Sequence, residues 1–173
     1  MTIHQRTPLS GEVMVDEVAL ATGCDVSRRA LPRETGGILV GWREGGGVVV
    51  REFLLVDDAQ AHNSTYERRH ATAQVVLERY LARTSDERVG YVGEWHSHPR
   101  PQPPSPQDNK SLRAAARLSP AQIALVVFAV DPSLDTVTPH GVIASRNTFR
   151  RIGLDDAAVR LRTDFNPPTE ERT

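Results

Sequence analysis

Two histidines and one aspartate have a spacing in this sequence that suits a metal ion. His96 and His98 stand two positions apart at the end of a segment with strand character, and Asp108 follows ten positions after His98. Successive side chains of a strand point to opposite faces, so both imidazoles project to the same side. Two imidazoles and one carboxylate leave a fourth position for water, as in catalytic zinc sites. Because zinc lowers the pKa of bound water to about 7, the pattern predicts a metal-dependent hydrolase.

Such a hydrolase also needs a general base, and two carboxylates compete for this role. Glu94 shares a strand face with the histidines, whereas Glu34 lies far upstream, directly before Thr35-Gly36-Gly37. The two glycines allow a close approach of the backbone at that point. The local pattern slightly favours Glu94, as a base, an outer-sphere partner or an additional ligand, and leaves Glu34 open.

A helix is predicted to begin beside this site. The run Ser105-Pro106-Gln107-Asp108 resembles a capping box, although Asp is not the usual partner in that motif. Pro106 would occupy the first helical position, where its missing N–H loses nothing. We therefore expect Ser105 to cap the helix whatever else it does. The positive end of that helix would favour negative charge nearby.

The remaining residues with chemical potential are minor candidates. His62 and His140 lie in loop-like contexts, and Cys24 reads as a small core residue rather than a nucleophile. A single cysteine excludes an internal disulfide and Cys-rich zinc modules. It also excludes a zinc deaminase of the kind that uses a Pro-Cys-x-x-Cys motif.

The bulk composition indicates one globular domain without a nucleic-acid or membrane partner. The 173 residues carry a net charge of −1, with lysines and arginines scattered along the chain. Nucleic-acid binding requires a concentrated basic face, which this pattern does not supply. No segment is apolar enough to span a bilayer, and the N-terminus lacks the apolar stretch of a signal peptide. A cytoplasmic location is the expectation.

Hydrophobic periodicity predicts strands interleaved with helices, which favours an α/β or α+β fold with a mixed sheet. The expected strands cover residues 12–15, 35–42, 48–56, 89–98, 121–130 and 137–145, and the expected helices cover 16–27, 66–83 and 107–118. Glu44-Gly45-Gly46-Gly47 reads as the turn of a hairpin. Residues 57–65 form a polar loop in this reading. One domain over residues 1–154 is expected, followed by a flexible charged tail over 155–173.

Taken together, three parts of the sequence resemble the signature of the JAMM (MPN-plus) metalloproteases, zinc isopeptidases that remove ubiquitin and ubiquitin-like proteins. These parts are Glu34, His96-Ser97-His98-Pro99 and Ser105-Pro106-Gln107-Asp108, and the flanking phrases 34–41 and 93–99 look like the bacterial branch. The likeness extends over about residues 12–152. Where the family usually has seven residues between the second His and the Ser, this chain has six, in the proline-rich loop 99–104.

The resemblance implies roles for individual residues. It implies that His96, His98 and Asp108 hold zinc, that Glu34 is the base, and that Ser105 helps to stabilise the oxyanion. Glu94 would then support the site or the fold. The resemblance also implies a cytidine-deaminase-like core, in which a mixed central sheet lies between helices.

The resemblance further implies a substrate class. Members of the bacterial branch cleave after the C-terminus of a ubiquitin-like modifier or its protein conjugates, some of them in antiphage systems such as CBASS. The same branch includes proteases that trim sulfur-carrier proteins, and related domains serve as non-catalytic scaffolds. A scaffold is expected to lack ligands that are all present here. The residues do not separate the possible substrates and do not set the oligomeric state.

Overall fold

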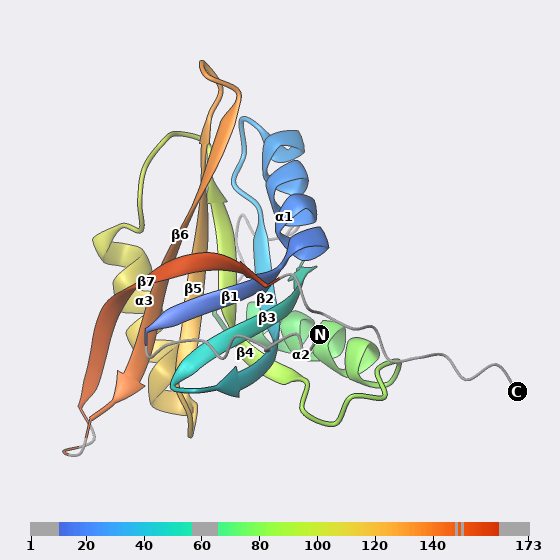
Figure 1. The fold of residues 1–173 in the computed structure, drawn as a ribbon, viewed down its shortest axis with the longest axis vertical. Coiled ribbons are helices and arrows are strands. Elements are labelled where there is room, and N and C mark those ends of the chain that lie inside the picture. The colour runs from blue at the N-terminus through green and yellow to red at the C-terminus, as the bar shows by residue number, and fades with distance from the viewer. Residues whose placement is uncertain (1–10, 57–65, 148, 150, 163–173) are drawn as a thin grey trace, which may run out of the picture.

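The computed structural model describes residues 11–56, 66–147, 149 and 151–162, and these residues form ten regular elements (Figure 1). The strands are β1 (Glu12–Asp16), β2 (Gly36–Glu44), β3 (Gly47–Leu55), β4 (Gly90–His98), β5 (Ile123–Asp131), β6 (Thr136–Arg146) and β7 (Ile152–Arg162). The helices are α1 (Glu17–Ala30), α2 (Tyr66–Leu81) and α3 (Pro106–Leu118). The predicted 57–65 loop lies outside the described residues.

The seven strands close into a barrel in the order β1-β3-β2-β4-β5-β6-β7. Closure depends on β7, which pairs with β1 in parallel and with β6 antiparallel. The pairs β1–β3 and β4–β5 are also parallel, and the remaining neighbours are antiparallel. The expected core, a mixed central sheet between helices, is therefore wrong, because the sheet closes on itself. The last strand pairs with the first, so every strand has a neighbour on each side.

The position of β7 also moves the start of the expected C-terminal tail. Residues 155–162 lie within β7, where Val159 is aligned with Val13 and Leu161 with Val15 of β1. Only residues 163–173 of the expected tail fall beyond the strand, and they lie outside the described residues.

The interior of the barrel is one hydrophobic cluster to which every strand contributes. Its buried members are Val13, Val15, Ala19, Leu39, Val48, Val50, Phe53, Val92, Trp95, Ala124, Val126, Phe128, Ile143 and Ala157. The rings of Phe53, Trp95 and Phe128 meet edge to face, with centroids 5.1–5.8 Å apart. Helix α1 packs against this cluster through Ala19 and Cys24. Cys24 is partly buried and packs against this cluster, which agrees with its reading as a small core residue.

The other two helices cover separate patches of the barrel. In α3, Leu112 and Ala116 pack against β5 and β6 side chains such as Val127 and Val142. In α2, Leu77, Tyr80 and Leu81 pack beside a smaller cluster that contains Met14, Val40, Trp42, Val49 and Val89. The predicted helices and the hairpin of β2 and β3 are confirmed. No described helix has both the length and the apolar character that crossing a membrane would require.

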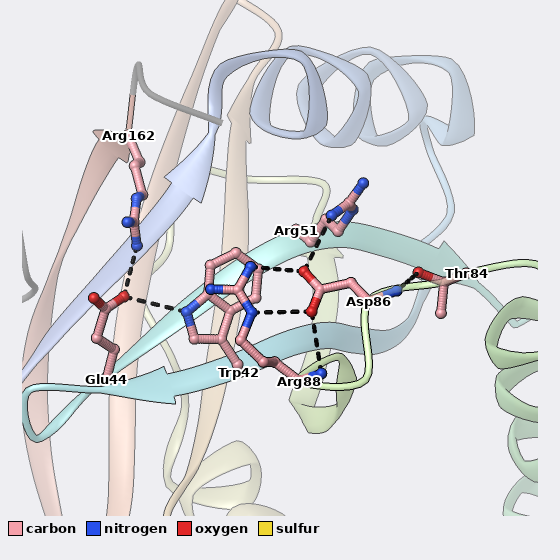
Figure 2. Close-up of polar contacts among 7 residues, drawn as sticks. All are labelled: Trp42, Glu44, Arg51, Thr84, Asp86, Arg88 and Arg162. Carbon is pink, nitrogen blue, oxygen red and sulfur yellow. Dashed lines mark hydrogen bonds and ion pairs between the residues drawn. The ribbon is translucent and has the colours of Figure 1, made fainter. Parts of the chain in front are cut away.

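A polar cluster, here called the Trp42 cluster, ties β7 to the β2–β3 hairpin and to the segment before β4 (Figure 2). It consists of Trp42, Glu44, Arg51, Asp86, Arg88 and Arg162. The guanidinium carbons of Arg88 and Arg162 lie 4.4 and 5.6 Å from the centroid of the Trp42 ring. Glu44 accepts hydrogen bonds from Trp42 Nε1 at 3.2 Å and from Arg162 at 2.8 Å. Asp86 accepts two hydrogen bonds from the Arg88 guanidinium, at 2.9 and 2.7 Å.

Candidate metal centre

Strand β4 delivers both histidines to one face, as the sequence predicts. Trp95 and Ser97 point into the barrel and are almost completely buried, so His96 and His98 face outward. Neighbouring strands hold β4 on both sides, because His96 is aligned with Gly36 of β2 and with Val127 of β5. The two ring centroids lie 4.9 Å apart. The imidazoles are therefore fixed side by side.

Helix α3 brings Asp108 to the same place. His96 Nε2 lies 3.3 Å from Asp108 Oδ1, and His98 Nε2 lies 3.4 Å from Asp108 Oδ2. The two Nε2 atoms are 3.1 Å apart, and all candidate ligand atoms of the group lie within 4.8 Å of one another. Ligands held about 2.0–2.1 Å from a tetrahedral zinc ion are separated by about 3.3 Å, so the three residues fit such an ion.

The proton on the ring of His98 is placed by a contact that sequence reasoning missed. His98 Nδ1 lies 2.9 Å from the backbone carbonyl oxygen of Gln102. A carbonyl can only accept, so Nδ1 donates and Nε2 keeps its lone pair for a metal. The loop of four prolines directs this carbonyl at His98. In the sequence, the feature that pointed toward this contact was the short loop between His98 and Ser105.

Ser105 and Asp108 form the predicted capping box of α3, which also positions the carboxylate. The Ser105 N–H donates to Asp108 Oδ2 at 2.6 Å, and the Asp108 N–H donates to Ser105 Oγ at 3.2 Å. Burial alone would raise the pKa of Asp108, but the Ser105 hydrogen bonds and the adjacent histidines lower it below its ordinary value. Since Ser105 Oγ accepts this bond, its own hydrogen can be donated to another group.

Burial prepares His96 to act as a ligand. Desolvation lowers the pKa of His96, and this effect outweighs the opposite influence of the Asp108 carboxylate. A neutral imidazole offers the lone pair that a metal requires, so the ligand form is favoured at neutral pH.

A cleft of about 460 Å³ opens beside the three ligands. It is lined by Glu34, His98, Pro99, Arg100, Gln102, Ser105, Gln107 and Asp108. Glu34 reaches it because the chain enters β2 beside the end of β4, where Gly36 is aligned with His96. Glu94 is aligned with Ile38 and Leu125 and does not line the cleft. The structure thus places Glu34, rather than the locally favoured Glu94, beside the ligands.

Of the other histidine candidates, only His140 lies among the described residues. His140 lies on β6, aligned with Val127 one strand beyond His96, and is not part of the ligand set. His62 lies outside the described residues. In the part of the chain that the structure describes, His96, His98 and Asp108 form the one cluster of three or more such side chains suited to a metal ion.

Comparison with known proteins identifies the family. Residues 17–151 match the family described as prokaryotic homologues of the JAB domain, and the chain belongs to this family. A similar fold occurs in the solution structure of protein DSY2949 from Desulfitobacterium hafniense, with a TM-score of 0.54 and 21% identity. That likeness covers 88% of this chain and 94% of the other. Among curated proteins, none matches the chain.

Proposed function

We propose that this protein is a zinc-dependent peptidase or isopeptidase that cleaves after the C-terminus of a ubiquitin-like modifier. The observation that carries the proposal is the convergence of His96, His98 and Asp108 at a cleft that His98 and Asp108 line together with Glu34. Membership of the JAB family, whose members are often hydrolytic, supports it. A non-catalytic scaffold would not need this complete set of groups.

Each group in the cleft has a chemical task in this proposal. His96, His98 and Asp108 would hold zinc, which supplies Lewis acidity and lowers the pKa of bound water. Glu34 accepts the proton of the attacking water and returns it to the leaving amine. The oxygen of the Ser105 hydroxyl already accepts the backbone N–H of Asp108. Its hydrogen donates to the oxyanion.

The substrate tail is proposed to add as a strand to part of β3. The first half of β3 offers no edge for this purpose, because Val48, Val49 and Val50 already pair with β1. Among the described residues, 52–55 pair with β2 alone, after a bulge at Arg51. Leu55 is aligned with Gly37, one position from the Gly36–His96 pair, so this half-edge leads toward the ligands. Backbone pairing of an extended tail there would direct its end into the cleft.

Cleavage of modifier fusions tests the proposal. The zinc-loaded protein is incubated with ubiquitin-like and sulfur-carrier fusions, and chelation followed by zinc addition must abolish and restore cleavage. Glu34→Gln should keep its zinc and lose about 10²–10⁴-fold in rate, because a general base contributes that much. Glu94→Gln is the matched control and should cleave like the parent.

Two results decide the assignment. Equal rates for Glu34→Gln and the parent would remove Glu34 from the role of base. If the loaded protein cleaves none of the fusions, the substrate class is wrong. The fusion that is cleaved distinguishes a deconjugase, such as one in an antiphage system, from a sulfur-carrier trimming protease.

A further inference from the structure

Ser97 lies between the two histidine ligands but faces the opposite way, into the barrel. Only 1% of its surface is exposed. Its N–H donates to the Thr35 carbonyl oxygen at 2.7 Å, and its hydroxyl oxygen accepts the Thr35 N–H at 3.0 Å. A buried hydroxyl needs a polar partner, and here the partner is the backbone one residue from Glu34.

These two hydrogen bonds determine where the chain leaves the sheet. The aligned pairs of β2 and β4 end at Gly36 and His96. In a regular antiparallel ladder, Thr35 would exchange both backbone hydrogen bonds with Ser97. The Thr35 N–H instead binds the Ser97 hydroxyl, so the backbone departs from the ladder at Thr35. The next residue toward the N-terminus, Glu34, lines the cleft.

The residues that follow Thr35 have little room to shift if the Ser97 contact is lost. A Cβ atom on Gly36 would lie 2.5 Å from the Trp95 carbonyl oxygen, and one on Gly37 would lie 1.9 Å from that of Leu54. The Gly36 carbonyl also accepts the Val56 N–H at 3.0 Å. Since β2 is held between β3 and β4, the Ser97 contact governs the direction in which Glu34 projects.

We infer that Ser97 is a positioning residue that holds Glu34 at the correct distance from the metal ligands. This inference rests on the proposed function. The hydroxyl belongs to the strand that carries both histidines, so it links the base and two ligands in one rigid unit. Loss of the hydroxyl leaves His96 and His98 in place and frees the Thr35 backbone.

Steady-state cleavage by zinc-loaded variants tests this role. Ser97→Ala should lower kcat by up to about 100-fold, because a displacement of roughly 1 Å in a catalytic group can have that effect. KM and zinc affinity should stay unchanged, and Ser97→Thr, which restores a hydroxyl, should recover kcat. Ser27→Ala is the matched control, since Ser27 is fully buried and donates to Gly23 within α1.

A double variant separates positioning from a general effect on the fold. If Ser97 acts only through the base, Ser97→Ala should cause no further loss in a Glu34→Gln background. A further loss of rate or of zinc affinity in that background would show that Ser97 acts on the ligands or on the fold, and the inference would be wrong.

Amide hydrogen exchange tests the contact without any substrate. The Thr35 amide should exchange faster in Ser97→Ala than in the parent, while amides in the middle of β4 stay protected. An unchanged Thr35 rate overturns the inference whatever the cleavage assay gives. If the Thr35 amide exchanges faster in Ser97→Ala but the parent cleaves no substrate, the proposed function is wrong and the structural role of Ser97 still holds.

Discussion

The metal centre and the Trp42 cluster are both networks of charged and polar side chains on the barrel, but they differ in how charge is balanced. In the Trp42 cluster, each carboxylate has an arginine partner, with Glu44 bonded to Arg162 and Asp86 to Arg88. In the metal centre, the groups that converge are acceptors, namely two Nε2 atoms and a carboxylate. The carboxylates of the first network are thus paired within the chain, and the second network is suited to a cation.

This difference separates stability from chemistry. The hydrogen bonds of Gln102 and Ser105 orient the ligands of the metal centre but do not neutralise them. Such a group could take up an ion without rearrangement, because its donors are already in place. The Trp42 cluster joins strands that are distant in sequence. Changes to the metal centre should therefore affect mainly ion uptake, whereas changes to the Trp42 cluster should affect mainly the free energy of unfolding.

The largest effect is expected at Asp108. Asp108→Ala removes one ligand and the acceptor of the Ser105 N–H, so zinc affinity and cleavage should both be lost. Zinc at 100 times its dissociation constant should stabilise the parent by about 2.7 kcal/mol, and the variant should show no such gain. Thermal unfolding with and without zinc measures this difference. The control is Asp155→Ala, an exposed carboxylate on β7; a variant at 108 that still binds zinc tightly would contradict the ligand assignment.

An intermediate effect is expected at Trp42. The side chain is 9% exposed, and its ring lies beside Arg88 and Arg162. Trp42→Ala should lower the free energy of unfolding by about 3–5 kcal/mol, as is usual when a large buried ring is removed. Urea denaturation measures this loss, and zinc affinity should match that of the parent. A variant that loses zinc as well would show that the two networks are coupled.

The smallest effect is expected at Asp86. The hydrogen bond from Arg88 is the main cause that lowers the pKa of Asp86 to about 2. Because the ordinary value is about 3.9, the contact stabilises the fold at neutral pH, and its contribution is lost as the pH falls from about 4 toward 2. Arg88 is largely exposed, so Asp86→Asn should cost below about 1 kcal/mol. Urea denaturation should show the variant and the parent converging in acid, and a constant difference would contradict this origin.

The sequence predicts the grouping of the three candidate ligands well because its determinants are local. His96 and His98 share a face through strand alternation, and Ser105 with Asp108 makes a capping box, so short-range rules suffice. The choice between Glu34 and Glu94 required the family resemblance. Glu34 reaches the cleft through the pairing of Gly36 with His96, a contact between residues far apart in sequence.

Barrel closure was missed for the same physical reason. The charges in residues 155–162 resemble those of a solvated tail, yet Arg160 pairs with Glu12 and Arg162 with Glu44. Both partners lie more than a hundred residues away in the sequence, so no local pattern reports them. Ser97 is a similar case, since only the structure shows that its hydroxyl meets the Thr35 backbone.

The pairing of β1 with β7 also has a consequence for synthesis of the chain. Val13 and Val159 are neighbours in the barrel, so the first strand cannot pair with β7 until residues near 160 have left the ribosome. Contacts of such long sequence separation slow folding. During translation, β1 has only β3 as a partner, and the nascent chain carries an open edge that the finished protein lacks.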